Sequence, residues 1–148
     1  MINTIGIARL MHLTPHFYGV MACNRITQFR NIDEASFILN TDPDFKPGEH
    51  WVGIYIKNNQ LFFFDSFGRN IEQFEDPFKT IMLNFTVEYE VITESKRLQN
   101  IFNDSCGYWV AYYIFCKTCK QNGFDHFVTD TYVNESMLKA QMNHFDLI

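Results

Sequence analysis

A cysteine stands at the expected start of a long apolar helix. Cys106 follows the run NDS at 103–105, whose residue types favour the N-cap position, and opens the stretch CGYWVAYYIF. A cysteine in the first helical turn lies at the positive end of the helix dipole, which favours the nucleophilic thiolate. The alternative is a small buried apolar cysteine, which suits Cys116 and Cys119 deep in the same helix. It suits Cys106 less well, because helix starts are rarely deep in a core.

Two strand-like runs flank a pair of asparagines. The runs are HWVGIYI (50–56) and QLFFFDS (60–66), and Asn58-Asn59 between them is a plausible tight hairpin turn. If the two asparagines form the turn, Lys57 pairs with Gln60. That register decides which side chains of the two strands become neighbours.

A histidine and an aspartate become neighbours in this register. Val52 faces Asp65, and His50, two residues before Val52, points to the same face of the sheet. Their backbones then lie about 7–8 Å apart, within reach of the side chains. A carboxylate at that place can hold an imidazole in one tautomer and stabilise its protonated form. The alternative is a chance surface ion pair at a strand end.

Two further residues gain interest only from their position relative to Cys106. Gln99 lies seven positions before it, and a side-chain amide held there could donate a hydrogen bond to a developing oxyanion, with the backbone N–H of Cys106 as the second donor. Taken alone, a glutamine is usually a surface residue. Gly107 keeps the backbone unobstructed where a substrate carbonyl must approach.

The pair Cys116-x-x-Cys119 invites a zinc or redox interpretation, which we reject. No second Cys/His pair stands at ligand spacing in the sequence, and the motif lies inside a helix instead of at its start. We therefore expect no metal and no cofactor. The other histidines show no partner pattern and are ordinary loop or surface residues.

Length and composition indicate a folded chain with a substantial core. The 148 residues are 47% hydrophobic and 17% aromatic, which fits one domain, 1–148, with no need for disulfides. The formal net charge of -5 makes nucleic acid a poor first partner. The sequence shows no secretory signal and no run of apolar residues long enough to cross a membrane, so we expect an intracellular protein with free thiols.

The elements that must position these residues are helices at both ends with strands between. We expect helices at 3–13, 74–83, 104–120 and 135–145, and strands at 35–40, 50–56, 60–66 and 86–92. The loop TDPDFKPGE separates the first two strands. This order predicts an α+β fold around a small sheet.

Together these residues resemble a known family. The run NTDPDFKPGEHWVGIYI followed by FFFDSFGR resembles the His and acid region of adenain-type (adenovirus-protease-type) cysteine proteases, which occur in adenoviruses and in the Polinton/Maverick, adintovirus and virophage group. The run RLQNIFNDSCGYWVAYYIF resembles the Gln and Cys region, and FYGVMACNRI the segment upstream of the first buried strand. The resemblance keeps the order His, acid, Gln, Cys from about Phe17 to Cys119.

The resemblance implies a fold and a set of roles. The fold is papain-like, of the adenain/ubiquitin-like-protease type, with a small mixed sheet packed by helices and the catalytic cysteine at the N-terminus of a buried central helix. Cys106 is then the nucleophile, His50 the general base and acid, Asp65 its orienting carboxylate, and Gln99 part of the oxyanion hole. Trp51 lines or braces the site, or is simply a packed strand residue.

Two departures from the family bear on these roles. Adenovirus enzymes carry Glu where this chain has Asp65, but relatives use Asp. The segment before the first strand often has Asp where this chain has Asn24. The chain is also shorter than the adenovirus enzymes, which a capsid-derived peptide and DNA stimulate. The net charge of -5 argues against a DNA requirement, and the sequence leaves a short activating peptide open.

The function implied is a cysteine endopeptidase that processes viral capsid and core precursor proteins during virion maturation. It would act inside the host cell, in nucleus or cytoplasm, and be packaged in the virion, and a small residue such as Gly would flank the scissile bond. The alternatives are a protease that deconjugates ubiquitin-like proteins, whose residue order is the same, and an inactive protease-derived structural module.

Overall fold

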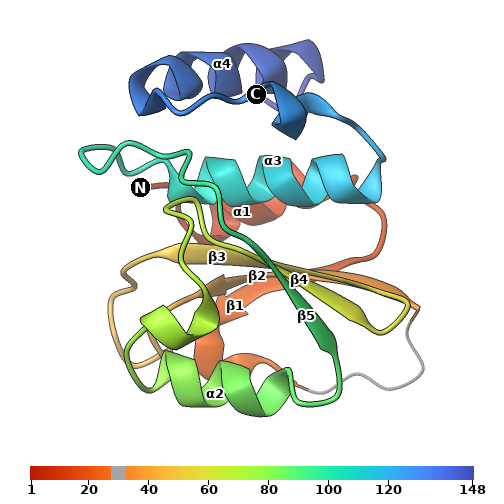
Figure 1. Ribbon diagram of the computed structural model, residues 1–148, viewed down its shortest axis with the longest axis vertical. Coiled ribbons are helices and arrows are strands. Elements are labelled where there is room, and N and C mark those ends of the chain that lie inside the picture. Colours follow the sequence, from red (N-terminus) through yellow and green to blue (C-terminus); the bar gives the residue numbers. More distant parts are fainter. Residues whose placement is uncertain (28–32) are drawn as a thin grey trace.

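A five-stranded sheet with helices on both faces forms the protein (Figure 1). The computed structural model describes residues 1–27 and 33–148. In chain order the elements are α1 (Thr4–Met11), β1 (Phe17–Ala22), the 3-10 helix η1 (Cys23–Arg25), β2 (Glu34–Asn40), β3 (Trp51–Lys57), β4 (Gln60–Phe64), the 3-10 helix η2 (Ile71–Gln73), α2 (Phe78–Phe85), β5 (Glu90–Glu94), α3 (Cys106–Thr118), the 3-10 helix η3 (Gly123–His126) and α4 (Thr131–His144).

The sheet is mixed, and its strands lie in the order of the chain, β1-β2-β3-β4-β5. The three central strands are antiparallel, whereas β1 runs parallel to β2 and β5 runs parallel to β4. Each parallel pair needs a crossover, which carries the chain out of the sheet and back. The predicted α+β architecture with a small mixed sheet is confirmed.

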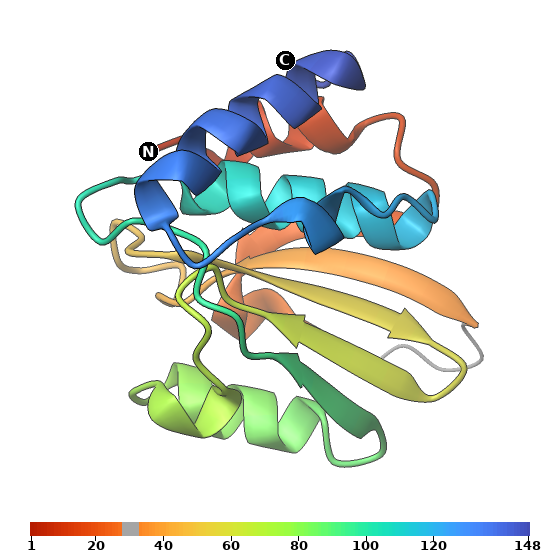
Figure 2. The same ribbon diagram turned by 45° about the horizontal axis from the view of Figure 1, so that its top comes forward.

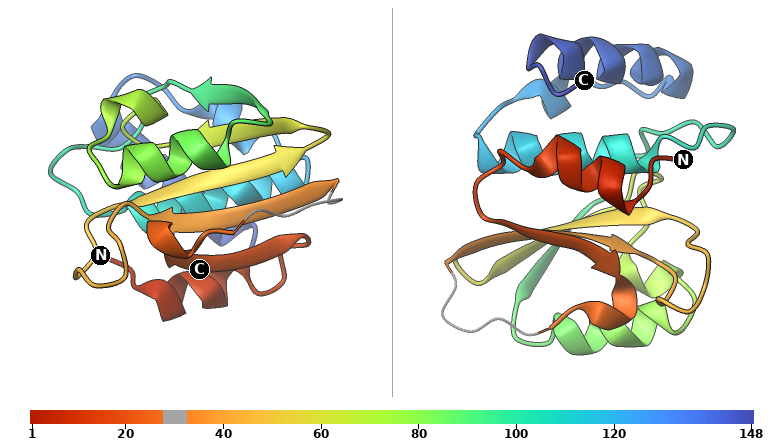
Figure 3. Two further views of the ribbon diagram at one scale, coloured as in Figure 1. Left: turned by 90° about the horizontal axis from the view of Figure 1, so that it is seen from below. Right: turned by 180° about the vertical axis from the view of Figure 1, so that it is seen from behind.

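Each face of the sheet has its own core. Trp109 and Tyr112 of α3 are fully buried in the core that α1, α3 and α4 share with one face. Phe37 and Phe63 belong to the core on the other face, where Phe85 and Phe78 of α2 pack against them. Figure 3 shows α1 beside α3 on one side of the sheet and α2 alone on the other, and Figure 2 shows α4 lying over α3 as an outer layer.

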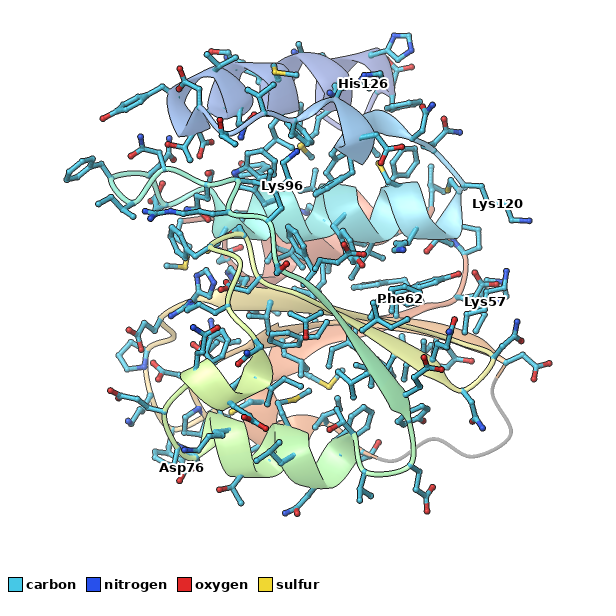
Figure 4. All side chains as sticks on the ribbon, in the orientation of Figure 1. Lys57, Phe62, Asp76, Lys96, Lys120 and His126 are labelled. Atoms are coloured by element: carbon cyan, nitrogen blue, oxygen red, sulfur yellow. The ribbon has the colours of Figure 1, made fainter. Side chains whose placement is uncertain are left out.

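The hairpin has the predicted register. Lys57 pairs with Gln60, and the ladder continues to Gly53 and Phe64. Asn58 and Asn59 have φ values of 51° and 67°, the left-handed backbone that the tight turn requires and that asparagine tolerates. Figure 4 labels Lys57, beside this turn, at the right of the view.

One helix and one strand begin several residues later than predicted. The helix expected at 74–83 begins only at Phe78, because Pro77 lacks an N–H and therefore starts a helix instead of continuing one, and Asp76 caps it by accepting bonds from Thr80. The strand expected at 86–92 begins only at Glu90. The four residues before it form the end of α2 and a turn.

Strand β1 was not predicted. It lies at the edge of the described sheet and pairs with β2, with a register shift between Phe17 and Gly19, and its residues are mostly half-buried. An edge strand of this kind lacks the clean alternation of buried and exposed residues that marks a strand in sequence.

The last helix, expected at 135–145, begins earlier, at Thr131, because the carboxylate of Asp130 caps it.

No helix in the described parts of the chain is long and apolar enough to cross a membrane. Among residues 1–27 and 33–148, no group of three or more His, Cys, Asp or Glu side chains could hold a metal ion.

Candidate active site

The start of α3, the residue before β3 and the residues after β4 meet at one edge of the molecule. In Figure 1 this is the left-hand end of α3, above the beginning of β3. Cys106 is the first residue of α3, His50 directly precedes β3, and Asp65 directly follows β4. The antiparallel hairpin therefore carries the imidazole and the carboxylate, and the central helix carries the sulfur.

His50 and Asp65 are in direct contact, as the hairpin register predicts. Nε2 of His50 lies 2.5 Å from Oδ1 of Asp65, and both side chains are buried, with Asp65 fully inaccessible to solvent. The ring of Phe67 stacks on the imidazole with 5.3 Å between centroids. The carboxylate and the aromatic ring together fix the plane of the imidazole.

His50 also reaches Cys106. Burial alone would lower the pKa of His50, but its hydrogen bonds to Asp65 and to Cys106 raise the pKa from 6.5 to about 9. The raised pKa favours the protonated imidazole at neutral pH, beside the carboxylate of Asp65 and the sulfur of Cys106.

Asp65 has a second partner that the sequence analysis missed. Nε of Arg69 lies 2.7 Å from Oδ2 of Asp65, and the backbone N–H of Arg69 donates to the same oxygen. Burial raises the pKa of Asp65, but the hydrogen bonds from His50 and Arg69 outweigh burial and lower the pKa. The guanidinium also lies over the ring of Phe74, 4.3 Å from its centroid. Asp65 is thus kept ionised.

A turn brings Arg69 back to Asp65. The N–H of Gly68 donates to the carbonyl of Asp65 at 2.8 Å, and Gly68 has a positive φ of 77°. A Cβ at Gly68 would lie 2.6 Å from the carbonyl oxygen of Ser95, so only glycine fits. The run DSFGR could have signalled this turn, but it could not show that the arginine folds onto the carboxylate.

Cys106 is more deeply placed than expected. Only 2% of it is exposed, so the argument that a helix start lies away from the core is wrong here. The reason is that α3 is the central helix, with its first turn packed under Trp51 and the N-terminal residues. Cys119, expected deep in the helix, is instead its C-cap and is half-buried. Ser105, the N-cap, makes no side-chain cap bond.

Gln99 is held in the segment that leads into α3. It is 1% exposed, and its Nε2 donates to the carbonyl oxygen of Asn103 at 2.6 Å. Its Oε1 lies 2.5 Å from the hydroxyl oxygen of Ser66. The alternative of an exposed surface glutamine is excluded, since the amide is buried, seven residues before α3 begins.

Trp51 and Gly107 lie against each other and against the N-terminal segment. Trp51 is 5% exposed, and its Nε1 donates to the carbonyl oxygen of Ile2 at 3.0 Å. A Cβ at Gly107 would lie 2.3 Å from Cγ2 of Ile2 and 3.2 Å from Cδ1 of Ile7. The missing side chain of Gly107 thus makes room for residues of this chain itself.

Two cavities include candidate residues. One of about 290 Å³ reaches His50 and Arg69, and one of about 550 Å³ lies between the N-terminal residues, Trp51 and the loop at 42–48. Cys106 lines neither cavity. A further cavity of about 370 Å³ is lined by Phe64, Tyr113 and Cys116 and does not include His50, Asp65 or Cys106.

The fold has counterparts among solved structures. The crystal structure of the ASFV protease is similar to this chain with a TM-score of 0.56 and 17% sequence identity, over 94% of this chain and 65% of that protease. The SUMO protease Ulp1 matches with a TM-score of 0.49 and 13% identity, over 97% of this chain and 75% of Ulp1.

The chain has the adenain-like cysteine protease fold. It spans about 65% of the length of the ASFV protease. Neither a protein-family model nor a curated protein matches the chain. Cys106 opens the central helix α3, at the position that the resemblance to adenain-type proteases implies for it.

Three other missed contacts join segments that lie far apart in the sequence. Ser66 meets Gln99, and Glu135 of α4 accepts hydrogen bonds from Ser105 and from the indole of Trp109, across at least 26 positions of sequence. No local pattern marks such partners.

Proposed function

We propose that this protein is a cysteine endopeptidase in which Cys106 is the nucleophile, His50 the general acid and base, Asp65 the carboxylate that orients His50, and Gln99 part of the oxyanion hole. The observation that carries the proposal is that His50, in direct contact with Asp65, also interacts with Cys106 at the first residue of α3. A cysteine beside an imidazole that a carboxylate orients is a recurring solution for nucleophilic acyl transfer. The adenain-like fold supports the same chemistry.

The proposed reaction transfers an acyl group to water. The Cys106 thiolate, favoured by the adjacent imidazolium, attacks the carbonyl carbon of a peptide bond. The resulting oxyanion accepts hydrogen bonds from Gln99 and from the backbone N–H of Cys106. His50 gives its proton to the leaving amine as the C–N bond breaks. A water molecule then adds to the acyl carbon and gives its proton to His50, and the C–S bond breaks to restore the thiolate.

The proposed substrates are capsid and core precursor proteins of a virus or virus-like element, cut during virion maturation. The likeness of the fold to a viral protease and the resemblance to adenain-type sequences of the Polinton/Maverick, adintovirus or virophage group support this. Trp51, which lines one of the cavities, would flank a small residue such as glycine beside the scissile bond. The enzyme would act inside the host cell and be packaged in the virion, with a short peptide as a candidate activator and no need for DNA.

The test is co-expression with the capsid proteins encoded beside this gene. We expect defined fragments with the wild-type chain and none with Cys106→Ala, a loss of at least about a thousandfold in rate. Cys116→Ala is the matched control, because Cys116 is a buried cysteine of the same helix and should leave cleavage intact.

Other outcomes separate the alternatives. Fragments that persist in Cys106→Ala would exclude Cys106 as the nucleophile. Rapid covalent capture of a ubiquitin-like protein ending in a Gly-Gly electrophile, without capsid cleavage, would favour the deconjugating protease. A chain that neither cleaves nor reacts would be a structural module.

A further inference from the structure

A buried hydroxyl binds the amide proposed for the oxyanion hole. Ser66 directly follows Asp65, is fully inaccessible to solvent, and has its Oγ 2.5 Å from Oε1 of Gln99. Nothing in its sequence context distinguishes this serine. The proposed mechanism does not use its hydroxyl, so the contact needs an explanation.

The contacts of Gln99 define which way its amide points. The carbonyl oxygen of Asn103 can only accept a hydrogen bond, so the group 2.6 Å from it must be the amide nitrogen of Gln99. The amide oxygen therefore faces Ser66, and the hydroxyl of Ser66 is the donor. An amide nitrogen carries two hydrogens, and one remains for a substrate oxygen after the bond to Asn103 is made.

The backbone of Ser66 holds the same segment. Its carbonyl oxygen accepts hydrogen bonds from the N–H groups of Leu98 at 2.9 Å and of Gln99 at 3.0 Å. One residue therefore anchors both the backbone and the side chain of Gln99. Since Asp65 binds His50, the dipeptide Asp65-Ser66 connects to the imidazole on one side and to the amide on the other.

We infer that Ser66 is a positioning residue that orients the Gln99 amide toward the oxyanion, so that the end of β4 aligns two parts of the site at once. This inference rests on the proposed function. Ser66 acts through Gln99 and does not touch the reacting atoms. Its loss should therefore weaken steps that form an oxyanion and spare steps that do not.

Two reagents separate those steps. Acylation of Cys106 by p-nitrophenyl acetate passes through an oxyanion, whereas alkylation by iodoacetamide is a displacement at carbon without one. We expect Ser66→Ala to slow acylation about tenfold or more and to leave the alkylation rate within about twofold of wild type, because losing an oxyanion donor outright costs about 100-fold or more. In a Gln99→Ala background, Ser66→Ala should have little further effect.

The matched control is Ser36→Ala. Ser36 is also a fully buried serine, but its hydroxyl has no hydrogen-bond partner among the described residues. The Ser36→Ala variant should therefore be acylated at the wild-type rate. If Ser66→Ala does not fold, Ser66→Cys replaces it, because the thiol has nearly the same shape and is a weak donor. Mass spectrometry assigns the modified cysteine in every case.

Three results would overturn the inference: acylation of the Ser66 variant at the wild-type rate, equal loss of acylation and alkylation, or a full further loss in the Gln99→Ala background. Failure of the proposed function looks different. In that case the wild-type chain and Cys106→Ala give the same acylation, and the inference falls with the function.

Discussion

At the scale of single residues, the electrostatic environment of His50 is unusual. It is buried, yet its pKa is raised to about 9, because the hydrogen bonds to Asp65 and Cys106 outweigh the cost of desolvating a cation. Arg69 contributes indirectly, since it lowers the pKa of Asp65 and so keeps the carboxylate charged. The ion pair of His50 with Asp65 stabilises the fold and also favours the proposed reaction.

The raised pKa predicts how stability depends on pH. The contribution of His50 to the free energy of unfolding should be fully present below pH 6.5 and lost as pH rises through about 9. Between these values the folded protein holds a proton on His50 that the unfolded chain has released, and above about pH 9 neither state holds it. This contribution to the free energy of unfolding is about 3 kcal/mol, because each unit of the pKa difference corresponds to about 1.4 kcal/mol. Between pH 6 and pH 9.5, wild type should therefore lose about 3 kcal/mol more stability than His50→Gln.

Urea unfolding at the two pH values measures this difference. His144→Gln is the control, because His144 is exposed on α4, and it should follow wild type. Parallel pH dependence of wild type and His50→Gln would show that the imidazole carries no such proton.

At the scale of elements, the first turn of α3 depends on what covers it. Gly107 lies against Ile2, Ile7 and Trp51, so the helix start is sealed by α1 and by the residues before it. In sequence, glycine after the cysteine suggests open access for a substrate. In the structure, the absence of a side chain admits Ile2 instead.

This packing predicts a conditional effect of Gly107→Ala. The new Cβ would lie 2.3 Å from Cγ2 of Ile2, so Ile2 must move, and we expect a loss of about 1–2 kcal/mol. In an Ile2→Ala background the clash is relieved. Alanine there should be neutral or stabilising by up to about 1 kcal/mol, since it favours a helix more than glycine does.

Urea unfolding of the two single variants and the double variant tests this coupling. An equal loss from Gly107→Ala in both backgrounds would mean that Ile2 does not limit the space at the helix start.

At the scale of the whole molecule, α4 supports the site from the outer layer. Glu135 accepts hydrogen bonds from the hydroxyl of Ser105 at 2.8 Å and from the indole of Trp109 at 3.3 Å, and Asn134 donates to the carbonyl of Leu98 at 3.3 Å. The C-terminal helix therefore holds both ends of the segment that contains Gln99. Figure 2 shows α4 lying across α3 in this outer position.

Glu135→Ala should loosen this segment and slow acylation of Cys106 by p-nitrophenyl acetate about tenfold, since small displacements of a catalytic group are costly. Glu135→Gln keeps an acceptor oxygen and should retain more of the rate. Lys139→Ala, at an exposed position of α4, serves as the control and should match wild type. The idea fails if Glu135→Ala is acylated as fast as the Lys139 variant.

The sequence alone determined the features that depend on local pairing. The Asn58-Asn59 turn sets the hairpin register, and that register predicted that His50 meets Asp65. The N-cap residues before Cys106 predicted the helix start to within two residues. Turn and capping preferences depend on residues that are neighbours in the sequence, so they can be recognised without a structure.

Only the tertiary structure decided what surrounds these residues. The burial of Cys106, the contact of Ser66 with Gln99 and the reach of Glu135 across to Ser105 all join segments about thirty or more positions apart or depend on layers stacked from the two ends of the chain. Such contacts follow from how helices pack on a sheet. Because many residue types can satisfy the same packing, the spacing of residues in the sequence does not predict these contacts.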